Sequence, residues 1–334
     1  MKIAFAGFRH GHIYVLYNMA KEHKEFEIVG AFESHQESRK SAEERGVCFN
    51  YDTYEQLLSD ENVSVVAIGS CYGDRGAMVI KALKAGKHVI CDKPLCTDLI
   101  ELDEIEKLSK EKSLVVSCAF TMRFDKKIIA VQNLIKSNKL GKINNVYFGG
   151  QHPLQYGRRP AWYFEKGKHG GVINDIAIHG IDLLAYLFAG EVEKINSARC
   201  WNAYAKEEPE FLDSAQFMLT LKNGAGVIAD VSYAIPDGVE FNLPYYWQFF
   251  IWGTEGMIGF SLSEKQLTNS QGEKQAFYFI KGMPNPIPLE EDQAENYLTD
   301  FLKVVRGEED VILPVEEVIK STRNTLLIQK KANN

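Results

Sequence analysis

The chain has 334 residues, of which 45% are hydrophobic and 25% charged, and its 38 basic and 45 acidic side chains give a net charge of −7. This length suggests two domains, and a chain of this size buries a full core without a disulfide or a metal. The ordinary composition excludes a disordered or fibrous chain, and the mild acidity argues against a general nucleic-acid binder.

Short apolar runs alternate with helical stretches through the first 120 residues. This alternation indicates βαβ units, and therefore an α/β fold with a Rossmann-type, doubly wound parallel sheet. We expect strands at residues 3–6, 27–33, 64–69, 88–91 and 114–117, and helices at 13–22, 37–45, 75–85 and 98–111.

The pattern changes after Arg123 to alternating apolar and polar residues. The strand predicted at 215–221 runs into Asn223-Gly224, a strong hairpin signal. These features predict an α+β domain with a large, mainly antiparallel sheet, open on one face and covered by helices on the other. We therefore divide the chain into residues 1–121 and 122–334. Further strands are expected at 227–233, 247–252 and 257–261, and helices at 291–305 and 315–330.

A glycine-containing turn joins the first predicted strand to the helix that follows it. The backbone N–H groups and helix dipole of such a turn bind the pyrophosphate of a dinucleotide. The turn departs from the GxGxxG spacing, because Arg9 and His12 stand where glycines are expected, and it also fits a plain strand-to-helix turn with surface cations. Its residues are Gly7, Phe8, Arg9, His10 and Gly11.

An acidic residue, Glu33, ends the second predicted strand. An acid at this place accepts hydrogen bonds from the adenosine ribose hydroxyls and repels a 2′-phosphate, so NAD is favoured over NADP. Ser34 and Arg39 lie nearby and keep NADP compatible with the sequence.

Two further segments carry a resemblance to a known family. Residues 86–94 (GKHVICDKP) close a strand–helix unit, and residues 170–179 (GGVINDIAIH) open a helix in the second domain. Together with the glycine turn they resemble the Gfo/Idh/MocA family of nicotinamide-dependent oxidoreductases, with its (E)KP and GGxxxDxxxH motifs. Residues 251–256 and 313–317 are similar to later parts of that family, so the resemblance spans the chain. Asp92 replaces the usual glutamate before Lys-Pro.

The resemblance implies that Lys93, Asp175 and His179 are catalytic and that the Lys93–Pro94 bond is cis. Oxidation of an alcohol removes the hydroxyl proton while a hydride leaves for nicotinamide C4, and histidine suits the proton step. We expect His179 to act as general base and Asp175, four residues away on the same helical face, to orient the substrate or stabilise the imidazolium. Lys93 would stabilise the developing alkoxide.

The resemblance also implies two sets of binding residues. A cyclic polyol could stack on Trp162 and accept hydrogen bonds from an arginine, although one of Arg158 and Arg159 fits a solvated loop equally well. The expected cofactor contacts are Gly7, Phe8, Arg9, His10, Gly11, Glu33, Ser70 and Asp92, and the expected substrate contacts are Arg123, Arg159 and Trp162.

These features predict an NAD-dependent oxidoreductase, with NADP as an alternative cofactor, that acts on a sugar, an inositol or a related polyol. A catalytically silent sugar- or NAD-sensing regulator and an NAD-dependent glycosidase of the same fold are the alternatives. The expected partners are the small-molecule substrate and further copies of the chain, in a homodimer or homotetramer, because an open sheet face needs a partner or a polar surface. No nucleic-acid or membrane partner is expected.

The cysteines and the amino terminus bear on the compartment. No secretory signal precedes the first predicted strand, and the six cysteines form no CxxC pair. We therefore expect reduced thiols, no metal site and a cytoplasmic location.

Overall fold

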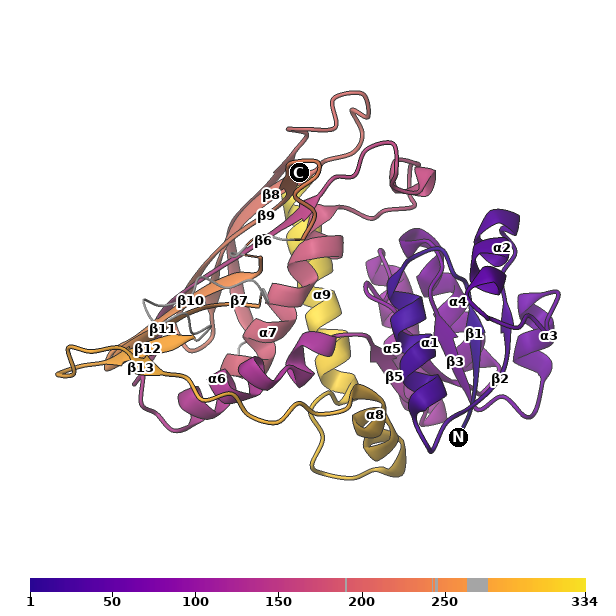
Figure 1. Cartoon of the computed structure of the whole chain (residues 1–334), viewed down its shortest axis with the longest axis horizontal. Coiled ribbons are helices and arrows are strands. Elements are labelled where there is room, and N and C mark those ends of the chain that lie inside the picture. Colours follow the sequence, from indigo (N-terminus) through magenta and orange to yellow (C-terminus); the bar gives the residue numbers. More distant parts are fainter. Residues whose placement is uncertain (190, 242, 244–245, 263–275) are drawn as a thin grey trace. The chain divides into compact units, whose positions relative to one another are not determined.

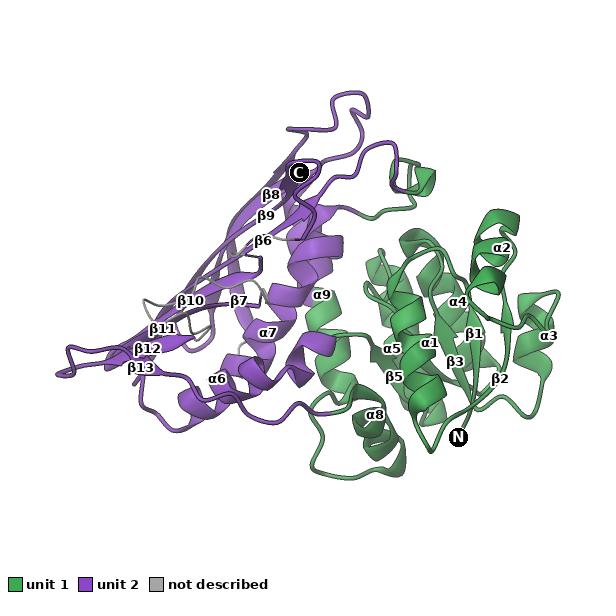
Figure 2. Ribbon diagram, viewed as in Figure 1, with its two compact units in different colours: residues 1–120, 160–170, 296–323 green, residues 121–159, 171–295, 324–334 purple. Residues whose placement is uncertain are grey.

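A computed structural model describes residues 1–189, 191–241, 243, 246–262 and 276–334. The chain divides into two compact units (Figures 1 and 2). Unit 1 combines residues 1–120 with 160–170 and 296–323, and unit 2 combines 121–159, 171–295 and 324–334. Residues 160–170 and 296–323 therefore fold with the amino-terminal residues, so the two units are not separated by a single boundary near residue 121.

Unit 1 is built on a parallel five-stranded sheet in the order β2-β1-β3-β4-β5, which confirms the predicted doubly wound fold. Helices pack around the sheet (Figure 1). The strands are β1 (Lys2–Ala6), β2 (Glu27–Phe32), β3 (Val65–Ile68), β4 (His88–Cys91) and β5 (Val116–Cys118), and the helices are α1 (His12–Glu22), α2 (Gln36–Glu44), α3 (Tyr54–Ser59), α4 (Tyr72–Lys84), α5 (Leu99–Lys112) and α8 (Tyr297–Arg306).

The strand order of unit 1 reverses between β1 and β3. Gly7, directly after β1, has a φ of +84°, and a Cβ atom there would lie 2.7 Å from the backbone nitrogen of Ser70, two residues after the end of β3. Only glycine fits this conformation and this close approach. Ligands of open α/β sheets bind beyond the carboxyl ends of the strands at such a reversal, so this edge is where a site is expected.

Unit 2 contains an eight-stranded sheet in its described residues, ordered β13-β12-β11-β10-β6-β9-β8-β7. All neighbours are antiparallel except β6 and β9, which confirms the predicted, mainly antiparallel sheet. Its strands are β6 (Ile143–Pro153), β7 (Val192–Trp201), β8 (Ser214–Leu221), β9 (Gly226–Ile235), β10 (Gln248–Gly253), β11 (Gly256–Ser261), β12 (Phe277–Ile280) and β13 (Ile287–Pro288).

One face of this sheet packs against helices α6 (Lys126–Lys136) and α7 (Ile178–Phe188), as Figure 1 shows. A Cβ atom at Gly180 of α7 would lie 2.3 Å from the Phe148 ring of β6, so glycine lets the helix approach the sheet closely. In β8 the buried Phe217 and Leu219 alternate with the exposed Met218, as expected for a sheet with one covered face.

The structure corrects two predicted helices. The helix expected at 291–305 begins only at Tyr297, because the Asn296 side chain accepts hydrogen bonds from the amides of residues 298 and 299 and caps α8 there. The segment after the glycine pair is a π-helix at Ile173–Ala177 before α7 begins. The last helix, α9 (Val315–Ala332), starts at the predicted residue. The elements not predicted are α3, α6, β6, β7, β12 and β13.

None of the helices in the described ranges combines the length and the apolar character that a bilayer span requires. The six cysteines are all free thiols.

Candidate active site

The glycine turn leads directly into α1. The amides of Arg9 and His10 donate to the carbonyl of Gly69, at 3.1 and 3.3 Å, which fixes the turn against the end of β3. Within the described chain the amides of Gly11 and His12 have no backbone acceptor, and the first turn of α1 carries no acidic side chain. A helix start with open amides and no acid favours an anion.

A cavity of about 410 Å³ lies beside this turn, a size typical of small-molecule sites. Trp162 forms one side of it: its indole Nε1 donates to the carbonyl of Arg9 at 3.3 Å, and its ring packs edge-on against Tyr72. The structure thus places Trp162, a predicted substrate residue, in unit 1 at the glycine turn. The cavity is lined by Phe8, Arg9, His10, Gly11, Tyr14, His35, Glu37, Ser38, Ser41, Pro160, Ala161, Trp162 and Glu165.

Glu33 is buried at the end of β2. One carboxylate oxygen accepts from the amide of Phe8 at 2.5 Å and the other from the amide of His35 at 2.7 Å. The side chain therefore ties the glycine turn to the loop before α2. Each carboxylate oxygen keeps a further lone pair, so the ribose contact stays a prediction that this geometry allows.

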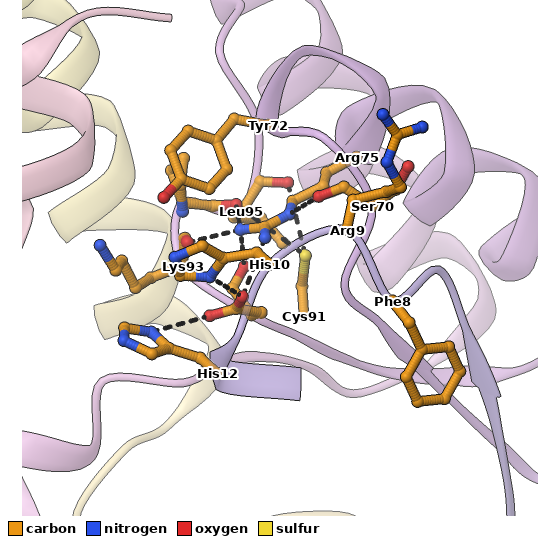
Figure 3. Close-up of polar contacts among 12 residues, drawn as sticks. Phe8, Arg9, His10, His12, Ser70, Tyr72, Arg75, Cys91, Lys93 and Leu95 are labelled. Atoms are coloured by element: carbon orange, nitrogen blue, oxygen red, sulfur yellow. Dashed lines mark hydrogen bonds and ion pairs between the residues drawn. The ribbon is translucent and has the colours of Figure 1, made fainter. Parts of the chain in front are cut away.

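The loop after β4 carries Lys93, and the Lys93–Pro94 bond is cis, as the family resemblance implies. Lys93 is buried, with its ammonium 5.9 Å from the centre of the Tyr72 ring. The fully buried Arg75 of α4 donates to three consecutive carbonyls of this loop, those of Asp92 (2.9 Å), Lys93 and Pro94 (3.2 Å) (Figure 3). Arg75 also donates to the carbonyl of Ser70 at 2.9 Å, so one guanidinium joins the ends of β3 and β4.

The Asp92 carboxylate is fully buried beneath this loop. Arg75 Nη2 lies 2.9 Å from it, His10 Nδ1 2.6 Å and His12 Nδ1 3.3 Å. Burial alone would raise the pKa of Asp92, but Arg75 and His10 outweigh this effect and hold the pKa well below its usual range. Asp92, which the resemblance assigned to the cofactor, thus contacts the groups that surround Lys93.

The predicted residues Asp175 and His179 lie in unit 2, at the π-helix and the start of α7. Gly170 and Gly171 both have positive φ angles and lead the chain into the π-helix, whose Ile173 amide donates to Gln329 Oε1 at 3.0 Å. π-Helical turns are rare and occur frequently at functional sites. The structure therefore buries Asp175 and His179 in a segment of special backbone geometry.

Aromatic side chains surround this segment. The Tyr233 hydroxyl donates to Asp175, and the His179 ring lies 5.5 Å from the Trp247 ring. His152 Nε2 is 3.2 Å from the Tyr246 hydroxyl. Trp247 has a φ of 51°, a strained value for a bulky residue. Tyr233, Tyr246 and Trp247 were not singled out from the sequence, because no spacing relates β9, which carries Tyr233, or the two residues before β10 to the GGxxxDxxxH motif.

The two predicted substrate arginines occupy different places in unit 2. Arg159 donates to the carbonyls of Pro153 and Leu154, and its guanidinium lies 4.9 Å from the centre of the Tyr233 ring. Arg123 is buried and pairs with both carboxylate oxygens of Asp182 on α7, at 2.8 and 2.7 Å. Arg159 therefore adjoins the partner of Asp175, whereas the contacts of Arg123 join two elements of the interior.

Comparisons with known proteins agree with this arrangement. The model of an oxidoreductase family with an NAD-binding Rossmann fold matches residues 1–120, and the model of the GFO/IDH/MocA C-terminal domain matches residues 128–259. The chain is 26% identical to myo-inositol 2-dehydrogenase from Thermotoga maritima over 247 residues, which cover 72% of this chain and 70% of that protein.

Two further proteins are similar. The chain is 27% identical to scyllo-inositol 2-dehydrogenase (NAD(+)) from Bacillus subtilis over 208 residues, which cover 62% of this chain and 57% of that protein. A solved structure from Erwinia carotovora atroseptica SCRI1043 superposes with a TM-score of 0.87 at 25% identity, covering 100% of this chain and 99% of that one.

Proposed function

Because the chain belongs to the Gfo/Idh/MocA family of oxidoreductases, whose NAD-binding Rossmann fold matches its first 120 residues, we propose that it transfers a hydride between a nicotinamide cofactor and a sugar, an inositol or a related polyol. The observation that carries this proposal is local to unit 1. The start of α1, which favours an anion, follows β1, and the buried Lys93 follows β4, with β3 between these two strands; both lie at the sheet edge where open α/β sheets bind ligands.

The cofactor would bind at the glycine turn of unit 1. The open amides of Gly11 and His12 and the Arg9 side chain suit its pyrophosphate, and the adjoining cavity suits its adenosine. The nicotinamide supplies the hydride acceptor or donor at C4. Gly7 and Ser70 lie so close together that a side chain at Gly7 would collide with Ser70. We expect the cofactor to rest against this pair of residues.

Glu33 would favour NAD over NADP. Its buried carboxylate is fixed by two backbone amides at the end of β2, so it cannot turn away from a ligand placed there. A 2′-phosphate beside a fixed negative charge in a site of low dielectric would be repelled strongly.

Lys93, Asp175 and His179 would carry the chemistry, an assignment that rests on the motifs that contain them. The Lys93 ammonium donates a hydrogen bond to the reacting oxygen and stabilises alkoxide charge as the C–H bond breaks. His179 accepts the hydroxyl proton, and Asp175, held by the Tyr233 hydroxyl, orients the substrate. In the reverse reaction His179 returns the proton to the carbonyl oxygen.

The substrate class follows from the relatives and from the surroundings of Asp175. Two similar proteins are named inositol dehydrogenases. In unit 2, Tyr233 and Trp247 combine aromatic faces with polar edges, and Arg159 lies against Tyr233. Aromatic faces bind the C–H side of a sugar or cyclitol, while carboxylate and guanidinium groups bind its hydroxyls. We therefore favour a sugar or an inositol over an apolar alcohol.

We also propose a homo-oligomer that pairs the open faces of the unit 2 sheets. Met218, Ile228, Tyr147 and Phe250 lie in register across β8, β9, β6 and β10, and the Phe250 and Trp252 rings stack at 5.8 Å. Most of this stripe is exposed, with Ile228 at 52% and Met218 at 48%. A row of large apolar side chains across an uncovered sheet is typical of a protein interface, and a second copy offers the same row.

The free cysteines favour a reducing compartment, and we propose the cytoplasm.

A spectrophotometric screen tests the proposed function. The purified protein is mixed with NAD or NADP and a panel of inositols, sugars and sugar acids, and the absorbance of reduced nicotinamide is followed. We expect reduction with at least one inositol or sugar, with NAD preferred. Tight ligand binding without cofactor reduction would identify a silent sensor instead. Cleavage of a glycoside with no net reduction would identify a glycosidase that oxidises its substrate transiently.

A further inference from the structure

The network around Asp92 was not predicted from the sequence. Its carboxylate gathers Arg75 from α4 and His10 and His12 from the glycine turn. His10 is 82 residues from Asp92 in the chain, and its Nδ1 lies only 2.6 Å from the carboxylate. The network lies directly below the loop that carries Lys93 (Figure 3).

Arg75 makes this network rigid. Its guanidinium is fully buried, and it binds the Asp92 carboxylate while donating to the carbonyls of Asp92, Lys93 and Pro94. An arginine that fills its donors in a fixed, planar arrangement restricts every group it touches. The carboxylate and the Lys93 backbone are therefore held by the same side chain.

The Asp92 carboxylate determines which nitrogen of His10 carries the proton. Asp92 is ionised, so only a proton on Nδ1 of His10 makes the short contact a hydrogen bond. Burial, together with the nearby charges of His12 and Lys93, lowers the pKa of His10 to about 4, against the opposing charge and hydrogen bond of Asp92. His10 is thus a neutral imidazole whose Nε2 is a hydrogen-bond acceptor.

His10 and Lys93 share their surroundings. The His10 ring packs edge-on against Tyr72 at 5.3 Å, and the Lys93 ammonium lies 5.9 Å from the same ring. Figure 3 shows the side chains of His10, Lys93 and Tyr72 gathered in one place. The titratable groups that face His10 are Asp92, His12, Lys93 and Tyr72.

The 2.6 Å distance between His10 Nδ1 and Asp92 Oδ2 also distinguishes a hydrogen-bonded network from a divalent metal site. A zinc ion needs about 2.0 Å to each nitrogen or oxygen ligand, so its ligand atoms stand about 3 Å or more apart. His10 Nδ1 and Asp92 Oδ2 are closer than that, and Arg75 binds the same oxygen with its positive charge. This arrangement favours a proton between the two atoms.

We propose that His10 is a positioning residue for Lys93. Held by Asp92 and Arg75, His10 keeps an uncharged acceptor nitrogen beside the Lys93 ammonium. The ammonium thereby stays charged and directed at the reacting oxygen. This inference rests on the proposed role of Lys93 in hydride transfer. A neutral acceptor stabilises the ammonium form of a buried lysine, whereas a second cation would destabilise it. The pair would therefore keep Lys93 ready to stabilise an alkoxide.

Two substitutions separate the nitrogens of His10. His10→Asn keeps a donor near Asp92 but removes Nε2, whereas His10→Gln places an acceptor near the position of Nε2. We expect His10→Asn to lower kcat about 10- to 100-fold, far more than it weakens NAD binding, and His10→Gln to recover part of the loss in kcat. His23→Asn, a change at the far end of α1 and outside this network, should have little effect.

A second readout does not depend on turnover. In the cofactor-free protein, two-dimensional nitrogen–proton NMR of labelled histidine should show His10 as the Nδ1–H tautomer, uncharged at pH 6. Labelled-lysine NMR should show a changed chemical shift of the Lys93 side chain in His10→Asn, relative to the wild type, and no change in His23→Asn. An Nε2–H tautomer, a charged His10 at pH 6, or an unchanged Lys93 signal in His10→Asn would overturn the proposal.

The two readouts distinguish this inference from the proposed function. If the NMR results are as expected but the wild type reduces no cofactor, then the His10–Lys93 coupling stands and the oxidoreductase assignment fails. If the wild type turns over and His10→Asn behaves like His23→Asn in both kcat and the Lys93 signal, then His10 has only a structural role.

Discussion

Replacing Asp182 with asparagine should destabilise unit 2 strongly. Asp182 on α7 holds both ends of the Arg123 guanidinium at 2.8 and 2.7 Å, and the two side chains are only 2% and 1% exposed. The substitution removes the carboxylate charge that binds the buried guanidinium. Removing one partner of a buried ion pair costs about 3–5 kcal/mol. That loss is a large part of the roughly 5–15 kcal/mol that stabilises a typical domain.

The loss should follow from the unpaired charge rather than from lost packing. A double variant, Arg123→Met with Asp182→Leu, removes both charges and refills the space with apolar side chains. Such replacements are often neutral or stabilising. We therefore expect the double variant to recover most of the stability that Asp182→Asn loses. Glu291→Gln, which removes one partner of the exposed Lys126–Glu291 pair in the same unit, serves as the control and should change stability far less.

Urea unfolding followed by tryptophan fluorescence measures these effects. Trp201, Trp247 and Trp252 all lie in unit 2, so the signal reports mainly on that unit. A wild-type midpoint for Asp182→Asn, or a double variant as unstable as the single one, would refute the reasoning. A double variant that is stable but no longer binds substrate would assign Arg123 to the substrate, as the family resemblance implies.

Four further outcomes are expected. Lys93→Ala should abolish hydride transfer while NAD binding, measured by calorimetry, remains; unchanged turnover would remove Lys93 from the chemistry. Glu33→Gln should shift the ratio of NAD to NADP affinity toward NADP by about tenfold, or 1.4 kcal/mol, and an unchanged ratio would rule out charge selection. Ile228→Lys should dissociate the oligomer in sedimentation experiments, whereas Ile100→Lys, at a residue 78% exposed in unit 1, should not. The same sedimentation behaviour in both variants would place the interface elsewhere. The pKa of His10 is lowered to about 4, so between pH 6.5 and 4 the unfolded chain binds a proton that the folded chain does not. Stability should therefore fall by up to about 3 kcal/mol as the pH drops through this window, and it should fall less in His10→Asn. Identical pH dependence of stability in the two proteins would contradict the lowered pKa of His10.

Local patterns in the sequence were enough to predict the sheet of unit 1. Its strands are short apolar runs between helices with clear periodicity, and each predicted strand overlaps an observed one. The glycine turn and the Lys93–Pro94 segment are continuous in the chain, so a motif can record them. Short elements were not predicted because they are too short to show a clear hydrophobic periodicity. For example, α3 has six residues and depends on a capping box between Thr53 and Gln56.

The contacts around the site could not be predicted in the same way. Asp92 meets His10 and Arg75 only after the strand order brings the ends of β1, β3 and β4 to one edge. No spacing in the sequence records that meeting. Tyr233 likewise reaches Asp175 from β9, 58 residues away, and the alternation of a strand shows only that Tyr233 is buried, not which group it meets.

The most direct test of hydride transfer traces the hydrogen itself. Inositols and sugars deuterated at their ring carbons are incubated with the protein and NAD, and the nicotinamide is examined by mass spectrometry and NMR. The proposed function predicts one deuterium at C4 of the reduced nicotinamide, together with a ketone on the polyol, and no such transfer in Lys93→Ala. Absence of deuterium from the nicotinamide with every polyol that the wild type binds would contradict the central claim.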